Sequence, residues 1–184
     1  MREQAETSLR DGAVTRLRTA TQPSHAVVDA AFSVFDLADR RHYGRFLQAH
    51  ARATGAAEAC LIDVPTLPPW RSRLPQLTAD LEGLGLGVPE ALAFTPAEGD
   101  AWHWGVLYVL EGSRLGSALV VKRAGSNVPT AYLSSRHLAG EWRSLLMAIE
   151  ARGDAGGAAW TDAAIAGARD CFALYQRAAM DMTA

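Results

Sequence analysis

The sequence has few cysteines and no long apolar run. Only two of its 184 residues are cysteines, Cys60 and Cys171, and they form no CxxC pair. This excludes a disulfide framework, and we interpret both as reduced thiols. No apolar segment is long enough to cross a membrane, and the polar start MREQAETSLRDG is unlike a signal peptide. The sequence therefore predicts a cytoplasmic protein that does not bind membranes.

Several motifs of common catalytic and metal sites are also absent. The sequence contains no HExxH, P-loop, GxGxxG or GxSxG pattern, and no Glu-x-x-His pair of the kind that builds carboxylate di-iron bundles. The formal net charge of −2 gives no general attraction for nucleic acid. A hydrophobic content of 49% with 21% charged residues is typical of a globular protein of this length. We expect one domain over residues 1–184 and no nucleic-acid partner.

Apolar residues recur at helical spacing, and no segment has a clear strand alternation, so the predicted fold class is all-α. Pro23 indicates either a kink in the first helix or a restart capped by Thr21. Thr95 to Glu98 has a capping-box pattern ahead of the fourth helix, and residues 153–157 predict a break before the last. Residues 1–12 are expected to be frayed. The predicted helices cover residues 13–35, 39–62, 70–84, 102–123, 134–149 and 161–180.

The helix expected over residues 102–123 carries glycines at an unusual spacing. Gly105, Gly112 and Gly116 are seven and four residues apart, so they leave one side of the helix nearly bare. Each costs about 1 kcal/mol relative to alanine in a helix interior. Two interpretations account for this cost. Another helix could pack closely against the strip, or a planar ligand could lie on it.

Among the five histidines, His25 has the most informative neighbours. Arg18 precedes it by seven residues and so lies on the same helix face. Asp29 follows by four, where its carboxylate could hold one ring N–H and strengthen the imidazole as a metal ligand. A structural histidine beside a solvated aspartate is the alternative.

Four segments together resemble one known family. They are LRTATQPSHAVVD (17–29), YGRFLQAH (43–50), LYVLEGSRLGSALVVKR (107–123) and RHLAGEWRSLLMAI (136–149). In order and spacing they are similar to the bacterial biliverdin-producing haem oxygenases, which occur beside bacteriophytochromes or in iron acquisition. The resemblance implies a single-domain helical bundle that holds haem between a proximal helix and a kinked distal helix.

The resemblance also implies an activity and its partners. Haem b, as both substrate and cofactor, would be cleaved to biliverdin, carbon monoxide and ferrous iron. The reaction would use O2 and electrons from a ferredoxin or an NADPH-dependent reductase.

Residue by residue, the resemblance assigns His25 as the iron ligand and Gly112 and Gly116 as the backbone over the haem face. Arg18, Lys122 and Arg123 would offer cations to the propionates at one rim of the haem. The expected catalytic set is Tyr108, Gly112, Ser113 and Gly116, and the expected haem-binding set is Arg18, His25, Asp29, Ser117, Lys122 and Arg123.

Two serines depart from the animal members of the family. Ser113 stands in place of an aspartate that anchors distal water, and Ser117 in place of a glycine, so the water network would be held by Ser113, Ser117, Tyr108 or Arg114. Two other functions are compatible with the sequence. One is a non-catalytic haem carrier or sensor on the same fold. The other is a thiamine-degrading relative with Cys60 or Cys171 as nucleophile.

Overall fold

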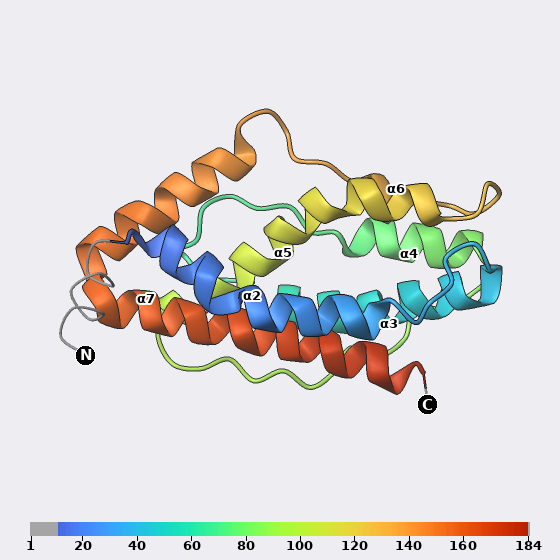
Figure 1. Cartoon of the computed structure of the whole chain (residues 1–184), viewed down its shortest axis with the longest axis horizontal. Coiled ribbons are helices and arrows are strands. Elements are labelled where there is room, and N and C mark those ends of the chain that lie inside the picture. The colour runs from blue at the N-terminus through green and yellow to red at the C-terminus, as the bar shows by residue number, and fades with distance from the viewer. Residues whose placement is uncertain (1–10, 184) are drawn as a thin grey trace.

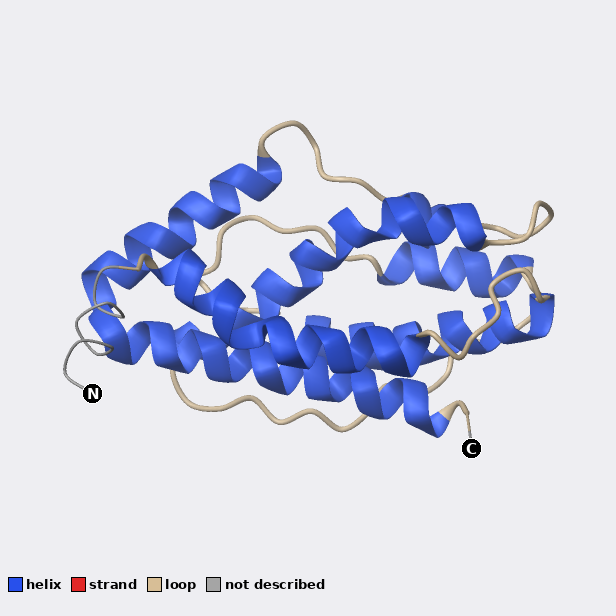
Figure 2. Ribbon diagram, viewed as in Figure 1, coloured by secondary structure: helices blue, strands red, loops and turns tan. Residues whose placement is uncertain are grey.

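The structure, a computed structural model, describes residues 11–183, with only the backbone for Ala118. Every regular element in this range is a helix, which confirms the all-α prediction (Figure 2). Fraying is expected over residues 1–12. Residues 1–10 lie outside the described range, and residues 11 and 12 precede the first helix. The elements are α2 (Ala13–Phe32), α3 (Arg40–Ala59), α4 (Leu74–Gly83), α5 (Asp100–Val120), the 3-10 helix η1 (Val121–Arg123), α6 (Ala131–Ser134) and α7 (Glu141–Asp181).

Helix α7 organises the bundle, because α5 and α2 both pack along it (Figure 1). It bends sharply at Gly157, where φ is 66° and ψ is −158°, a conformation that residues with a side chain rarely adopt. The break predicted over residues 153–157 is thus confined to this one glycine. Thr161 does not start a new helix, since its hydroxyl donates to the carbonyl of Gly157 at 3.1 Å.

Helix α2 continues through Pro23, so a restart capped by Thr21 is wrong. The Thr21 hydroxyl donates instead to the carbonyl of Leu17 at 2.8 Å, within the preceding turn. Figure 1 shows α2 changing direction along its length, as expected where proline removes a helical hydrogen bond.

The first turn of α2 is fixed by both halves of α7. The Glu150 carboxylate, before the bend, accepts a hydrogen bond from the backbone N–H of Val14 at 3.0 Å. Asp162, after the bend, pairs with Arg16 at 2.8 Å. The helix that carries His25 is therefore positioned by residues far away in the sequence.

Helices α5 and α7 cross with their backbones in contact. A β-carbon added to Gly105 would overlap the carbonyl of Ala164, and one added to Gly167 would overlap the backbone of Trp102. Close helix packing therefore explains Gly105. The crossing is why α5 tolerates the low helix propensity of this glycine.

Several predicted boundaries are corrected by tertiary contacts. Helix α5 begins at Asp100 after Gly99, so the capping box at residues 95–98 does not form. Helix α4 begins at Leu74 with a proline in its first turn. The short helix α6 was not predicted from the sequence, because a carboxylate far away in the chain stabilises its start. Asp80 accepts the N–H groups of Ala131 and Tyr132, each at 2.8 Å. Among the described helices, none has the combination of length and hydropathy that spanning a membrane requires.

Candidate functional site

The helices α2 and α5 lie in register and run in the same direction. Near the start of α2, the charge of Arg18 acts on the Tyr108 phenol of α5. Beyond the end of α2, the N–H of Gly125 donates to the carbonyl of Leu37 at 3.1 Å. The sequence offsets of these two pairs, 90 and 88 residues, are nearly equal. Counting residues along both helices between these two pairs, we infer that His25 lies level with about residue 114 of α5, between Gly112 and Gly116.

The His25 ring is held on one side and open on the other. Its Nδ1 lies 2.9 Å from Oδ2 of Asp29, as the four-residue spacing predicts. The edge of the ring meets Phe172 of α7, with the centroids 5.6 Å apart. The His25 side chain is 62% exposed, and among the described residues Asp29 is the only polar partner of its ring. Nε2 is therefore free to bind a metal, with the imidazole plane already restrained.

The stretch of α5 level with His25 leaves backbone and apolar side chains uncovered. A β-carbon at Gly116 would meet nothing within 4 Å, and one at Gly112 would meet only the ring of Trp142. Leu115 and Leu119 are 52% and 72% exposed. The two interpretations of the glycine strip therefore apply to different parts of it: Gly105 packs against a helix, whereas Gly112 and Gly116 leave room for a ligand.

Ser113 and Ser117 do not lie on that open side. The Ser113 hydroxyl accepts from Nη1 of the buried Arg73 at 2.5 Å, and Ser117 accepts from Nη2 at 3.3 Å. Their expected place at the ligand is corrected, because they face the interior of the bundle on the side of α5 turned toward α4. They hold the guanidinium of Arg73 on the interior side of α5.

Arg114 is likewise an interior residue. It is buried and donates to Glu111 at 3.0 Å and to the Ser135 hydroxyl at 2.6 Å. It therefore fixes the loop before α7 and does not reach the open side of α5.

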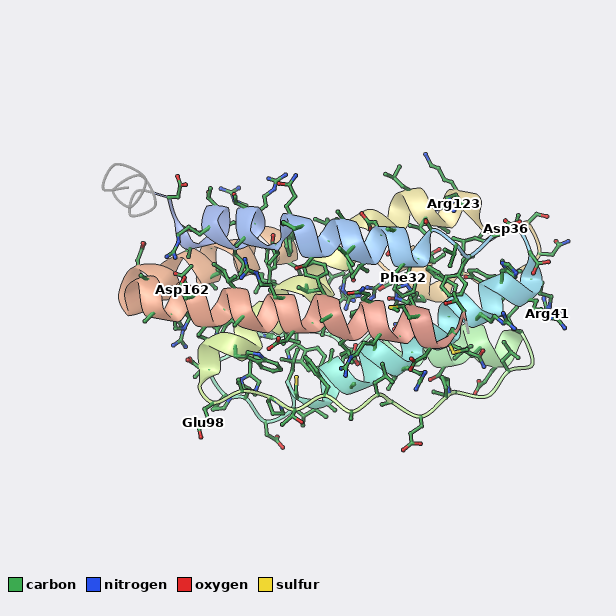
Figure 3. All side chains as sticks on the ribbon, turned by 60° about the horizontal axis from the view of Figure 1, so that its bottom comes forward. Phe32, Asp36, Arg41, Glu98, Arg123 and Asp162 are labelled. Carbon is green, nitrogen blue, oxygen red and sulfur yellow. The ribbon has the colours of Figure 1, made fainter. Side chains whose placement is uncertain are left out.

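Lys122 and Arg123 lie at the wrong end of α5 to join Arg18. In Figure 3, Arg123 and Asp36 lie at one end of the molecule and Asp162, the partner of Arg16, at the other. Fifteen residues separate Tyr108 from Arg123, which is about 22 Å of helix. The expectation of one cationic rim is corrected, because α2 and α5 run in the same direction and their C-terminal ends lie together.

Arg18 and Tyr108 form the polar end of the region. Burial raises the pKa of Tyr108, and the positive charge of Arg18 partly opposes this rise. The phenol is therefore a neutral donor at physiological pH, and the charge of Arg18 is near enough to act on it. Together they suit a carboxylate.

A buried polar cluster below α5 was not predicted from the sequence. The ring of His50 lies 4.4 Å from those of Phe32 and Phe46, and its Nδ1 is 2.8 Å from the Tyr132 hydroxyl. Burial, with a contribution from the charge of Arg73, lowers the pKa of His50 to about 3. This imidazole is neutral. The only signal for it in the sequence was its place at the end of the segment YGRFLQAH.

Neither cysteine is poised as a nucleophile. Burial raises the pKa of Cys60 to about 11 and that of Cys171 further still. Both are therefore thiols at neutral pH, whereas a cysteine nucleophile acts as the thiolate. The structure disfavours the thiamine-degrading alternative.

A separate pocket of about 250 Å³ adjoins the open side of α5. Its walls come from residues 68–71, α5 and the first turns of α7. Trp142 lines it and also lies 5.6 Å from the Tyr108 ring, so this indole divides the pocket from the open glycines. The pocket is too small for a porphyrin.

The arrangement favours a large planar ligand that brings its own metal coordination. In the described part of the chain, no three His, Cys, Asp or Glu side chains gather at one point. His25 therefore offers one axial nitrogen, and the uncovered side of α5 offers a flat apolar surface at the same level. These are the features that an iron porphyrin requires.

The chain is similar to known proteins over most of its length. No protein-family model matches it. A curated haem oxygenase from Xanthomonas campestris pv. campestris (strain 8004) is 36% identical over 148 residues, a match that covers 74% of this chain and 88% of that protein. The NO- and CO-bound haem oxygenase from Neisseria meningitidis has a similar fold, with a TM-score of 0.78 over 93% of this chain and 92% of that chain at 24% identity.

Proposed function

The chain belongs to the haem oxygenase family, and we propose that it binds haem b between α2 and α5 and cleaves it to biliverdin, carbon monoxide and ferrous iron. The reaction consumes O2 and electrons from an external donor such as a ferredoxin or an NADPH-dependent reductase. Two observations support the proposal: Asp29 restrains the imidazole of His25, and the backbone of α5 is open at Gly116. We assign the activity to a single domain spanning residues 1–184.

His25 would hold the haem iron through Nε2, and Asp29 would orient its ring. A carboxylate on Nδ1 fixes the tautomer and makes Nε2 a stronger donor. When bound, the haem supplies the iron that activates O2 and the porphyrin carbon that is oxidised. A histidine ligand lacks the electron push of a thiolate, so the site is not built to split bound oxygen as the thiolate-ligated enzymes do.

Gly112 and Gly116 let α5 approach the opposite face of the haem. The absence of side chains brings backbone groups close to the reacting centre, and the helix limits the space in which oxygen can lie. Leu115 and Leu119, which are largely uncovered, would be buried by the porphyrin. This burial supplies much of the affinity.

Arg18 and Tyr108 are proposed to receive a haem propionate. Replacing Arg18 with glutamine should weaken haem binding by up to about 5-fold, because an exposed ion pair contributes at most about 1 kcal/mol. The product isomers should change more than the affinity, since the propionates set the in-plane orientation. Absorbance titration and chromatography of the biliverdin isomers measure the two effects.

Arg123→Gln is the matched control, because it removes an exposed arginine at the opposite end of α5. It should leave both the affinity and the isomer mixture unchanged. Equal effects of the two substitutions would remove Arg18 from the site.

The proposed activity is tested by adding a reductant to the ferric haem complex in air. An oxygenase loses the Soret band and forms biliverdin, identified by chromatography, whereas a carrier or sensor keeps the band. Catalase is included so that free peroxide cannot cause the bleaching. A Soret band that survives several equivalents of reductant would contradict the enzymatic function and favour the carrier.

A further inference from the structure

Arg169 of α7 holds a backbone carbonyl of the helix that carries His25. Its Nη2 and Nε both donate to the carbonyl oxygen of Ala20, at 3.1 and 3.3 Å. A helical carbonyl oxygen normally accepts the N–H four residues on. Two further donors from one guanidinium to such an oxygen are therefore an unusual addition. Ala20 lies three residues before Pro23.

Pro23 explains why this turn of α2 needs support from outside the helix. Proline has no N–H for the carbonyl of Thr19, and its ring presses against that carbonyl. The turn containing Thr19 and Ala20 is therefore opened, and the helix bends (Figure 1). Without a partner on the open side, the bend could vary, and the second half of α2 would vary with it.

The bend lies directly before the proposed ligand. Ala20 and His25 are five residues apart, which is about 7.5 Å along the helix. Three residues beyond Arg169 on α7, Phe172 meets the His25 ring edge-on at 5.6 Å. The same stretch of α7 therefore contacts α2 on both sides of Pro23.

Helix α7 also fixes α5, since Gly105 of α5 contacts the backbone at Ala164. The separation between His25 and the open backbone of α5 thus depends on how each helix is attached to α7. For α5 the attachment is a backbone crossing. For α2, the hydrogen bond from Arg169 to the Ala20 carbonyl, just before the bend, is the polar attachment to α7 nearest to His25 in sequence among the described residues.

We propose that Arg169 is a positioning residue for iron ligation: by holding the Ala20 carbonyl, next to the Thr19 carbonyl that Pro23 leaves without an amide partner, it sets the tilt of His25 toward α5. The inference rests on the proposed function, because it takes His25 as the ligand. Arg169 would act through the backbone of α2, without contact to haem.

The test compares Arg169→Ala with Arg169→Lys, which keeps a cationic donor. In the haem-free protein, the alanine variant should shift the His25 ring proton resonances, because the ring moves relative to Phe172, and should speed hydrogen exchange of the amides of residues 24–32. In the ferrous haem complex, the iron–histidine stretching band should shift and kcat should fall roughly 10-fold, with little change in KM, as for other partners that orient a ligand. Lysine should restore most of each property.

Arg177→Ala is the matched control. Arg177 is also on α7 and also donates to a backbone carbonyl, but to that of Ala93, at 3.3 Å, in the segment before α5. It should change neither the His25 resonances nor the stretching band.

The role of Pro23 is tested by a double-mutant cycle. Pro23→Ala restores the missing amide, so Arg169→Ala should have less than half of its original effect in that background. Unaltered His25 resonances and an unaltered band in Arg169→Ala, even with a lower melting temperature, would overturn the inference by reducing Arg169 to a helix-docking contact. A wild-type complex that shows no iron–histidine band would instead contradict the proposed ligand, while the haem-free resonances would still decide the role of Arg169.

Discussion

Replacing His25 with alanine should abolish iron ligation and lower haem turnover by more than about 100-fold. This loss should exceed the one typical of a residue that only orients a metal ligand. The expectation follows from the free Nε2 and the Asp29 contact at Nδ1, which prepare this imidazole as a ligand. Absorbance spectra of the ferric complex report ligation, and biliverdin formed in a single turnover reports activity. The apolar surface of α5 should still give weak binding.

His103→Ala is the control for this substitution. His103 lies in the first turn of α5, with its Nδ1 3.0 Å from the Gly99 carbonyl that precedes the helix, more than two turns before Gly112. Its loss should leave the spectrum unchanged. A His25→Ala protein with the wild-type spectrum and normal turnover would show that another residue binds the iron.

Alanine should have opposite effects at two glycines of α5. At Gly105 the new methyl group overlaps the backbone of α7, so the helices must separate, at a cost of about 1–3 kcal/mol, or roughly 2–10 °C in Tm. At Gly116 nothing opposes the methyl group, and the better helix propensity should add about 1 kcal/mol, or roughly 2–4 °C. Thermal unfolding of the haem-free proteins measures both.

Turnover separates the two glycines further. Gly116→Ala should be the more stable protein and the poorer enzyme, because its methyl group occupies space proposed for haem and oxygen. Gly112→Val should impair turnover by the same mechanism in a protein that still folds. Folded Gly112 and Gly116 variants with normal turnover would mean that these glycines serve only the helix, and a destabilised Gly116→Ala would contradict the open surface.

The sequence predicted what depends on spacing within one helix. His25 and Asp29 lie together, as their four-residue spacing predicts, and the shared face of Arg18 and His25 stays a prediction. Helices α2, α3, α4, α5 and α7 also follow from local patterns of apolar residues, although the sequence divided α7 into two. The glycine spacing indicated a bare strip, but it could not divide the strip between helix packing and ligand.

The errors concern relations between distant segments. Placing Arg123 beside Arg18 required the relative direction of α2 and α5, which no local pattern contains. The serines of α5 were expected at the ligand because nothing in the sequence indicates that Arg73 would enter from the segment before α4. Helix α6 was missed for the same reason, since its N-terminal amides are satisfied by Asp80, about fifty residues earlier.

The attachment of α2 to α7 has a consequence for how the protein is made. The helix that carries His25 is translated well before its partners on α7, since its contacts with Glu150, Asp162 and Arg169 span 136 to 149 residues. At 5–20 residues per second, translation needs roughly 7–30 s to deliver these partners. During that interval, the apolar face of α2 is not yet covered by α7. If His25 holds haem as proposed, this histidine is correctly placed to capture the substrate only after α7 has emerged and docked.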